Sequence, residues 1–477
     1  MTQAQLTDLI EKPADLLSTL KSERPNVDIS KLLAQYEPEK HAIMDPAQVP
    51  DKPIKTDRGD STAPINRIAI PLQKKIVQYA AAFLCGNKIQ LDASAKNEQK
   101  KLLDVIQKTL DDNKMQYKDL QIAEILFSET EVAELWHSET LKNGDDYWAG
   151  TANEKKSTVR FRMRILANSL GDKLYPSFNE FNDMNAFGRY YTTGNSDAQK
   201  EHLDFYTEDA IRHYEKGTDD WKLVKKTPNP TRKIPIIYYR KNKAEWEDVQ
   251  PHITRYETSI SRHGDTNDYF GSPVILLKGS IEGFAKKGES GKVLTLSKGA
   301  EAEYMTWDHS PESVKLEQNN LRSLSFDMSD TPDISFTQMS KLGVESGYAM
   351  KMLFLAPHLK AARNEMIFGE GVQRRLNFLK AAMMRANVSL EKARSLVIKP
   401  KFKYFLPENA TEELDNIVSA AQGGILSIES AVEKSPLTSD KDAEIKRLAA
   451  EKKAAETDPR GLDNDNNDDD ETGDDEG

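Results

Sequence analysis

Apolar residues recur with helical spacing over a long stretch in the last third of the chain, from Ser346 to Arg394. Five of them follow one another at steps of three or four residues: Phe368, Val372, Leu376, Leu379 and Met383. This spacing lines one helix face with apolar side chains and predicts a long amphipathic helix. Because Pro357 lacks an amide N–H, a kink or break is expected there. A strand-like run, Leu396 to Phe405, follows the helix.

Two helices of similar length are predicted in the middle of the chain. The first carries apolar residues in a narrow seam, a pattern typical of helices that pack on a neighbouring helix: Trp246, Val249, Ile253, Tyr256 and Ile260. Pro251 lies inside this pattern, so the regular helix begins or bends there. The second helix is marked by Val314, Leu321, Leu324 and Met328. Residues 265–308 between them are Gly-rich and strand-like, and an antiparallel pair would form a stalk of about 30 Å with this β module at its far end.

The remaining patterns predict an α+β fold. Residues 1–60 are polar and Pro-rich and are expected to be irregular, with short helical hints from Leu6 to Leu20. A helix is expected to end at Gly86 with a left-handed cap. Residues 130–240 hold short runs rich in β-branched and aromatic residues, which predict a mainly antiparallel sheet. After Pro407 the pattern is helical again, with Ser427 as an N-cap.

Composition indicates a protein with a large polar surface. Of the 477 residues, 30% are charged, and the longest apolar run, Ile76 to Cys85, is half of the ~20 residues needed to span a bilayer. The N-terminus lacks the basic and apolar regions of a secretory signal, so no membrane partner is predicted. A single cysteine, Cys85, excludes an intrachain disulfide and is expected to be a small buried hydrophobe.

Charge is distributed unevenly along the chain. The net charge is -11, and the segment 456–477 holds eleven acids and one base, so the rest of the chain sums to about -1. This acidic tail is predicted to be disordered, and both a solubility role and a functional role stay open for it. The stretch from Ser346 to Arg394 holds nine Lys or Arg against three Glu. Pairing with acids on neighbouring helices or subunits is favoured over nucleic-acid binding, because aromatic residues that stack on bases are sparse there.

The search for catalytic chemistry is negative. The sequence GESGKV lacks the Gly and the Ser or Thr of a nucleotide-binding loop, since Lys286 and Val293 occupy those positions. The eight histidines are scattered, and no set of zinc ligands can be assembled by spacing. Glu129, Glu131 and Glu134 are better explained as solvated surface charges than as a Mg²⁺ site. We therefore predict no catalytic residue, no cofactor and no metal, and expect that the protein is not an enzyme.

Several phrases, in order, resemble the portal proteins of tailed double-stranded DNA bacteriophages, of the siphophage type, over roughly residues 60–455. They are IVQYAAAFLCGNKIQL, then AFGRYY, DFYTED and PNPTRKIPIIYY, then the helix–β module–helix unit, and finally SDTPDISFTQMSKLGVESGYAMKMLFL with the long helix after it. The resemblance implies a β-rich wing, a two-helix stem carrying a small β clip, a long tunnel and wing helix, and a helical crown. The implied boundaries are 61–243 for the wing, 244–264 and 309–328 for the stem helices, 265–308 for the clip, 329–345 for a tunnel loop, 346–407 for the long helix and a wing strand, and 408–455 for the crown.

The resemblance also implies a function. A portal forms a cyclic homo-oligomer, typically a dodecamer, at one capsid vertex of the virion, is assembled in the host cytoplasm, and passes double-stranded DNA during packaging and ejection. Its implied partners are the terminase large subunit, the major capsid and scaffolding proteins, and head-completion or adaptor proteins. The implied channel residues are those of the tunnel loop: Asp333, Ser335, Thr337, Gln338, Ser340 and Lys341. The implied contacts between subunits in the stem are Trp246, Val249, Ile253, Tyr256, Ile260, Leu321 and Leu324.

A DNA conduit should not bind its cargo tightly, because each neutralised phosphate adds binding free energy. We therefore expect most basic side chains between Lys351 and Arg394 to face neighbouring subunits or the capsid rather than the channel. Two other classes of protein stay open at this point: a monomeric scaffold or adaptor, and a metal-dependent enzyme acting on nucleic acid. Hydrodynamic size distinguishes a monomeric adaptor from a ring. A metal-dependent enzyme would need carboxylates that converge at the ends of strands.

Overall fold

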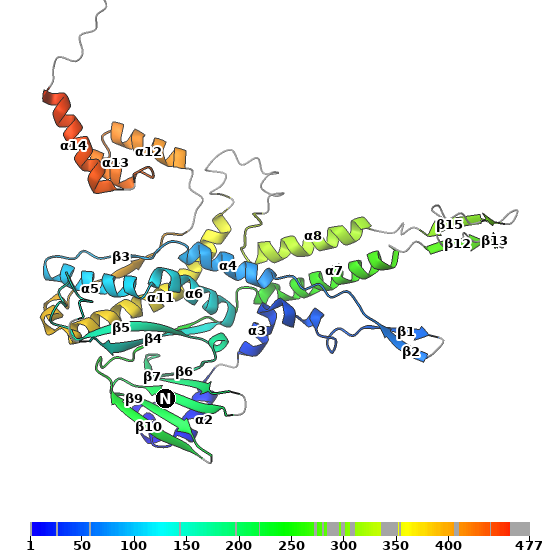
Figure 1. The fold of residues 1–477 in the computed structure, drawn as a ribbon, viewed down its shortest axis with the longest axis horizontal. Coiled ribbons are helices and arrows are strands. Elements are labelled where there is room, and N and C mark those ends of the chain that lie inside the picture. The colour runs from blue at the N-terminus through cyan, green and yellow to red at the C-terminus, as the bar shows by residue number, and fades with distance from the viewer. Residues whose placement is uncertain are drawn as a thin grey trace, which may run out of the picture. The chain divides into compact units, whose positions relative to one another are not determined.

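The computed structural model describes most of the chain (Figure 1). The described residues are 2–24, 27–56, 59–142, 145–195, 198–218, 220–270, 274–278, 281–283, 295–296, 301–305, 311–334, 352, 354–404, 410–438 and 440–457. Two compact units are present: residues 1–341 with 353–405, and residues 342–352 with 406–477. Both helices and several small sheets occur in the first unit, which confirms the predicted α+β class.

Two antiparallel sheets form the centre of the first unit. The three-stranded sheet has the order β11-β4-β5, with β4 (Glu131–Thr140), β5 (Val159–Leu166) and β11 (Ile236–Arg240). The five-stranded sheet has the order β10-β9-β8-β7-β6, with β6 (Lys173–Phe178), β7 (Met184–Thr193), β8 (Lys200–Tyr206), β9 (Ala210–Lys216) and β10 (Trp221–Pro228). The antiparallel sheet structure predicted for residues 130–240 is confirmed.

The sheets and helices pack as successive layers. Along β4, alternate residues point to opposite faces, so Val132 and Trp136 pack toward the helices while Ala133 and Leu135 pack toward the five-stranded sheet. Residues 131–136 are all buried for this reason. The second apolar layer joins Leu135 to Phe187 and Tyr206 of the five-stranded sheet. The three-stranded sheet is thus covered on both faces.

The N-terminal segment is more ordered than predicted. It forms α1 (Gln3–Ile10), α2 (Pro13–Glu23), α3 (Ile29–Tyr36), the short 3-10 helices η1 (Pro38–Lys40) and η2 (Ala42–Met44), and the hairpin of β1 (Lys52–Thr56) and β2 (Gly59–Ala63). Leu6, Leu16 and Leu20 are fully buried against Leu203 and Phe205 of the five-stranded sheet. The prediction of an irregular segment was wrong because these leucines share an apolar face that the outer side of this sheet covers.

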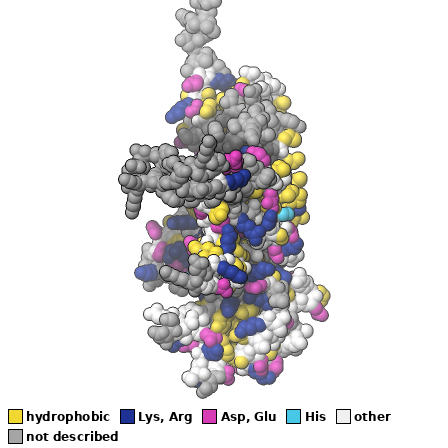
Figure 2. Space-filling view, turned by 90° about the vertical axis from the view of Figure 1, so that its right-hand side faces the viewer, with side chains coloured by type: hydrophobic (Ala, Val, Ile, Leu, Met, Phe, Trp, Pro, Cys, Tyr) yellow, Lys and Arg dark blue, Asp and Glu magenta, His cyan; other side chains and the backbone are white. Residues whose placement is uncertain are grey.

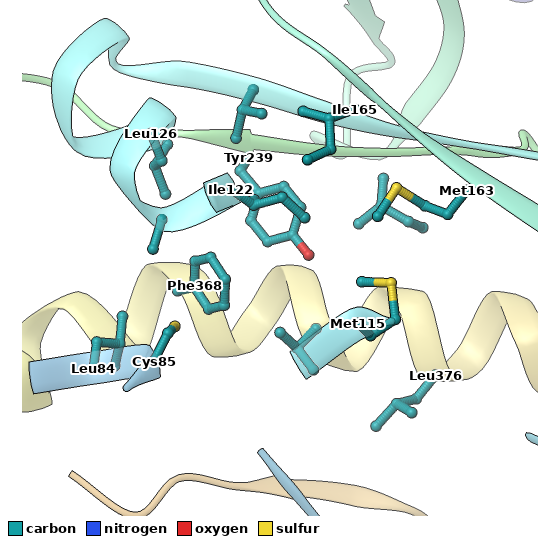
Figure 3. Packing of buried hydrophobic residues seen from close by; sticks show 14 of the residues in the cluster. Leu84, Cys85, Met115, Ile122, Leu126, Met163, Ile165, Tyr239, Phe368 and Leu376 are labelled. Carbon is teal, nitrogen blue, oxygen red and sulfur yellow. The ribbon is translucent and has the colours of Figure 1, made fainter. Parts of the chain in front are cut away.

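A helical layer covers the three-stranded sheet. It consists of α4 (Leu72–Cys85), α5 (Glu98–Asp112), α6 (Met115–Glu129) and the long α11 (Leu355–Ala386). Figure 3 shows Phe368 of α11 near Tyr239 of β11 and Cys85 of α4, and the two aromatic ring centroids are 5.3 Å apart. α4 ends at Gly86 as predicted, but this residue has φ -64°, so its cap is not left-handed. A Cβ there would lie 2.3 Å from the Ala82 carbonyl oxygen, and this close approach accounts for the glycine.

The long helix begins later than the sequence pattern indicates. α11 is a 32-residue helix that starts at Leu355, so Pro357 lies in its first turn. Amides of the first turn have no carbonyl partner within a helix, and proline is tolerated there. The expected kink or break is therefore the start of the helix. After α11 and η5 (Val388–Ala393), the strand β16 (Lys399–Lys401) pairs with β3 (Gln90–Asp92).

The two predicted middle helices lie side by side (Figure 1). α7 spans Gln250–Phe270 and follows the 3-10 turn η4 (Glu247–Val249), while α8 spans Pro311–Met328. Pro251 is the second residue of α7. Of the two predicted alternatives, a helix that begins at this proline or one that bends there, the structure has the first. Between the helices lie β12 (Val274–Lys278) paired with β15 (Glu301–Met305), and β13 (Ile281–Gly283) paired with β14 (Thr295–Leu296). Another 3-10 turn, η3 (Asn168–Leu170), connects β5 to β6.

The second compact unit is helical in its described part. It contains α12 (Ala410–Gln422), α13 (Ile428–Lys434) and α14 (Lys441–Thr457). The side chain of Ser427 accepts a hydrogen bond from the backbone N–H of Ser430 at 3.2 Å, which confirms the predicted N-cap. The acidic tail after Thr457 lies outside the described residues. Within the described part of the chain, no helix combines the length and apolar character that a bilayer span requires.

Close packing of α11 against β11 leads to a first prediction, for the variant Gly371→Ala. A Cβ on Gly371 would lie 2.0 Å from a ring carbon of Tyr239, which is itself 2% exposed. Since neither the helix nor the ring has room to move, we expect a loss of stability of about 1–3 kcal/mol or more, as for other overpacked cores. Thermal unfolding of the purified protein measures this loss.

Gly369→Ala is the matched control, two residues earlier on the same helix. Its Cβ would meet Phe402 at 3.4 Å, an ordinary contact. Alanine has a higher helix propensity than glycine, so we expect this variant to be unchanged or more stable by up to about 1 kcal/mol. Equal melting temperatures for the two variants would contradict the packing argument.

Candidate functional site

A buried arginine joins the long helix to the helical and sheet layers beneath it. Arg375, in the middle of α11, is 2% exposed. Its Nε donates to both carboxylate oxygens of Glu134 at 3.0 Å, and its Nη2 donates to Asp119 at 2.6 Å. The hydroxyl of Tyr239 also donates to Glu134. One charged group on α11 therefore bridges to α6, β4 and β11. A charge is tolerated in this buried position because it is paired and hydrogen-bonded.

Burial sets the ionisation of this cluster. It raises the pKa of Asp119 above its ordinary value, and the adjacent Arg375 guanidinium opposes this shift without cancelling it. Burial likewise raises the pKa of the Tyr239 hydroxyl, so this group stays a hydrogen-bond donor. Burial acts against the charge of Arg375, but Asp119 and Glu134 outweigh it and the pKa of the guanidinium is raised. The arginine is therefore a fixed positive charge between two acids.

The acids that the sequence placed on the surface are buried. Glu129, Glu131 and Glu134 are 1%, 5% and 0% exposed, and the last two lie on β4 rather than on a helix. Glu131 accepts hydrogen bonds from Asn168 at 2.9 Å and from the Tyr238 hydroxyl at 2.9 Å. The expectation of solvated surface charges was wrong, because both faces of β4 are covered. Their partners come from distant elements, and the spacing of the acids alone does not reveal them.

A second charge cluster lies where the segments before α7 and after α8 meet the start of α11. Glu245, between β11 and α7, pairs with Lys360 at 2.7 Å and with Lys241, and it accepts from Asn364 at 2.9 Å. Lys360 also donates to the carbonyl oxygen of Ser329 at 2.6 Å, just after α8 ends. Burial alone would raise the pKa of Glu245, but Lys360 and Lys241 together outweigh it and lower this pKa. We call these residues, 241, 245, 329, 360 and 364, the anchor cluster.

The described start of the predicted tunnel loop is tied to two helices. Asp330 pairs with Arg363 of α11 at 2.6 Å, and Asp333 pairs with Arg322 of α8 at 3.0 Å. After the loop, Phe354 directly precedes α11, is 3% exposed, and has its ring centroid 5.6 Å from that of Phe83. Of the predicted loop residues, Asp333 is therefore an ion-paired group at the loop's first end. The others, Ser335, Thr337, Gln338, Ser340 and Lys341, lie outside the described residues.

The predicted stem contacts divide into two groups. Trp246, Val249 and Ile253 are at most 1% exposed and belong to the chain's own core, so they have no free surface for a neighbouring subunit. Tyr256, Ile260 and Leu321 are half-buried, and Leu324 is 40% exposed. Contact between subunits stays a prediction for the partly exposed residues. The periodic seam was correctly assigned to helix packing, but its first part packs within the chain.

Most basic residues of the long helix have partners in the same chain. Besides Arg375 and Lys360, the described pairs are Arg363 with Asp330, Arg374 with Glu370, and Lys380 with the carbonyl oxygens of Arg394 and Leu396. Lys and Arg are also interspersed with Asp and Glu on the face shown in Figure 2. Internal pairing thus accounts for much of the basic character that the sequence displays. Whether the exposed bases face a neighbouring subunit stays a prediction.

Cys85 matches its expected role. It is 3% exposed within the core of the first unit, and burial raises the pKa of its thiol well above the usual value. A thiol held in its protonated form is a poor nucleophile.

Comparison with known families identifies the chain. Its sequence matches the family described as "Phage portal protein, SPP1 Gp6-like" over residues 21–458. The chain belongs to the phage portal proteins. The matched range includes α7, α8, the strands between them and all of α11. Portal proteins are structural components rather than enzymes, and the resemblance inferred from the sequence is confirmed.

Two solved structures are similar to this portal protein at low identity. A chain of the virion of a native gene transfer agent particle is 10% identical with a TM-score of 0.41, and the match covers 85% of the portal protein and 92% of that chain. A chain of the neck of an empty gene transfer agent particle is 10% identical with a TM-score of 0.40, with 75% and 86% covered. Both scores are low, so the assignment rests on the family match. No curated protein matches the sequence.

The anchor cluster of the portal protein generates a second prediction, for Glu245→Ala. This change leaves Lys241 and Lys360 buried without their acid, and we expect a loss of stability of about 3–5 kcal/mol, as for other broken buried pairs. Arg363→Ala, which removes the exposed pair with Asp330, is the control and should cost less than about 1 kcal/mol. Thermal unfolding measures both. A similarly small loss for Glu245→Ala would mean that the buried pairs with Lys241 and Lys360 do not stabilise the fold.

A third prediction concerns pH and the raised pKa of Asp119. Because the folded state binds this proton more tightly than the unfolded chain, the carboxyl contributes stability that is present below about pH 3.8 and is lost as the pH rises through the folded pKa. Asp119→Asn removes this titration. We therefore expect the destabilisation caused by Asp119→Asn to shrink as the pH is raised from the acid side toward neutrality, measured as the difference in unfolding temperature from the wild type.

Glu139→Gln supplies a control of opposite sign. A hydrogen bond from Arg160 lowers the pKa of Glu139, so this carboxylate stabilises the protein above its unfolded pKa and ceases to do so as the pH falls. The effect of Glu139→Gln should therefore shrink toward acid pH. If the two variants change with pH in the same direction, Asp119 is not the group that titrates.

Proposed function

We propose that this portal protein forms a ring at one vertex of a phage capsid, through which double-stranded DNA is packaged and ejected. The observation that carries the proposal is the family match over residues 21–458, which covers the stem helices, the β module between them and the long helix. In the proposed ring, each chain contributes one stem and one tunnel loop. The subunit number is proposed to be twelve.

The energy for DNA movement would come from another protein. The chain's one approach to a nucleotide-binding loop, GESGKV at residues 288–293, lacks two required residues and lies outside the described residues. We propose that the terminase large subunit docks on the clip, residues 265–308, and supplies ATP hydrolysis. Major capsid and scaffolding proteins would surround the ring, and head-completion or adaptor proteins would bind it after packaging.

The contacts around the start of the tunnel loop support a role for this loop at the channel. Asp333 is paired with Arg322 of α8, and Lys360 links the end of α8 directly to α11. Hydrogen-bonded ion pairs require a defined geometry of their partners. We propose that this geometry sets where the loop's Ser, Thr and Gln side chains meet the DNA, with polar groups that do not hold the phosphates tightly.

Exposed apolar side chains on α8 support a contact between subunits. Leu316, Leu324 and Met328 are 61%, 40% and 65% exposed, although α8 also packs on α7. A ring closes through heterologous contacts, in which one face of each subunit covers a different face of the next. We propose that the neighbouring subunit covers this side of α8. A metal-dependent nuclease is the competing class of protein. It is disfavoured because its candidate acids Glu131 and Glu134 are already engaged in buried hydrogen bonds.

The fourth prediction is the mass of the protein in solution. Twelve chains of 53.8 kDa amount to about 645 kDa, and light scattering after gel filtration separates this mass from that of a monomer. Leu324→Glu places a charge in the proposed contact and should lower the ring fraction, because burying an unpaired charge is costly. Leu324→Met keeps the apolar volume and should leave the ring fraction unchanged.

The outcomes are distinct. A discrete species near 645 kDa that Leu324→Glu depletes supports both the ring and the contact. A ring that neither variant alters places the contact elsewhere on the chain. A protein that stays monomeric at high concentration and in the presence of its capsid proteins overturns the conduit in favour of a monomeric adaptor.

A further inference from the structure

Two histidines and a glutamate come together on one face of the five-stranded sheet. His202 of β8 lies directly opposite Glu215 of β9 in the antiparallel register. His213 precedes Glu215 by two residues on the same strand, so their side chains share a face. One ligand atom from each of the three residues lies within 4.8 Å of the other two. The sequence hides this group, because His202 and His213 meet only once the β8–β9 hairpin has formed.

Each imidazole is held through one of its nitrogens. The Nδ1 of His213 is 2.5 Å from a carboxylate oxygen of Asp204, and the Nε2 of His202 is 2.6 Å from the Thr193 hydroxyl. In metal sites, a ligating histidine typically forms such a bond with its second nitrogen, which fixes the ring and leaves the other nitrogen for the ion. Here the nitrogens left over are Nε2 of His213 and Nδ1 of His202.

The Nδ1 of His202 is buried without a hydrogen-bond partner among the described residues. The residue as a whole is 8% exposed. Buried polar atoms without a partner are uncommon, and each calls for an explanation such as an ion or a water. This atom is independent evidence for a ligand, because it does not depend on the proximity of the three side chains.

We propose that His202, His213 and Glu215 bind a divalent transition-metal ion of the Zn²⁺ class. Two imidazole nitrogens and one carboxylate oxygen are ligands that zinc accepts, with a water in the fourth tetrahedral position. Ca²⁺ and Mg²⁺ prefer sites built from oxygen ligands, so they fit this group poorly. The site lies in the predicted wing, and it does not depend on the proposed function.

Binding requires a local rearrangement. Ligand atoms around tetrahedral zinc are about 3.3 Å apart, given metal–ligand bonds of about 2.0–2.1 Å, so atoms that now lie within 4.8 Å of one another must approach by up to about 1.5 Å. The two imidazole rings are stacked, with centroids 5.3 Å apart and planes 19° from parallel, and the ion would tilt them toward each other. Glu215 also pairs with Lys200 at 2.7 Å, but this lysine is 64% exposed and the pair is readily given up.

The consequence of binding would be a sheet cross-linked by metal. The ion joins β8 to β9, and the Thr193 contact extends the connection to β7. A ligand that binds only the folded state stabilises it by an amount that grows with the logarithm of its concentration. The ion thereby stiffens the five-stranded sheet on the face opposite to α1 and α2.

The test is zinc binding by the full-length protein, purified without a histidine tag and stripped with a chelator. Zn²⁺ is added, unbound metal is removed by gel filtration, and the metal retained per chain is measured. We expect one ion per chain, and a rise in unfolding temperature that the chelator reverses. Co²⁺ in place of Zn²⁺ should give the visible absorption of a tetrahedral site. Glu215→Gln and His213→Gln each remove a ligand. Loss of a residue that only supports a ligand typically lowers metal affinity by about 10–100-fold, so we expect each of these variants to lose at least that much zinc affinity.

Lys200→Gln is the matched control. It removes the same ion pair as Glu215→Gln but keeps all three ligands, so its zinc affinity should be equal to or higher than that of the wild type. His137→Gln, on the exposed part of β4, should also bind normally. The proposal is overturned if the wild type retains no zinc. It is equally overturned if Glu215→Gln and His213→Gln retain as much zinc as Lys200→Gln, since the metal would then be held elsewhere.

Discussion

The ion pair between Arg375 and Glu134 is the contact on which the first compact unit depends. It places a positive charge of the long helix against the central strand of the three-stranded sheet, and Asp119 extends it to α6. Apolar attraction is non-directional, whereas a buried ion pair with hydrogen bonds requires its partners in a defined geometry. The position of α11 along the sheet is thereby specified, and with it the point at which the helix begins. The anchor cluster then relates that point to the end of α8.

Periodicity predicted the elements that carry one apolar face. The face from Phe368 to Met383 and the strands of residues 130–240 were found where the pattern places them. The seam from Trp246 to Ile260 is only partly helical, because α7 begins at Gln250, after Trp246 and Val249. The pattern failed where a residue's surroundings come from distant segments. From the sequence alone, Glu134 is predicted to be a surface acid, because the burial of β4 on both faces is not visible there. Leu16 and Leu20 indicate only a short helix, because the sheet that buries them comes from a distant part of the sequence.

The burial and the partners of charged residues were the features least predictable from the sequence. Most basic side chains of the long helix were expected to face neighbouring subunits or the capsid, yet Arg375 and Lys360 are among the buried residues of the chain. The histidines looked scattered by spacing, although the hairpin register brings His202 opposite Glu215. A hairpin turn near residues 207–209, extended into paired strands, would have been the signal for this group. In each case the missing information was which residues face each other, and family resemblance supplied the architecture without supplying these pairs.

The hydrogen bond between Lys360 and Ser329 has an evolutionary consequence. It joins two positions that are 31 residues apart in the chain and so closes the segment between them. The entropy of closing a loop grows only slowly with its length, by about 0.6 kcal/mol for each doubling. Insertions and deletions between these two positions should therefore change the stability of the first unit only slightly. The length of this segment can vary among descendants of one ancestral protein while the fold around it is kept.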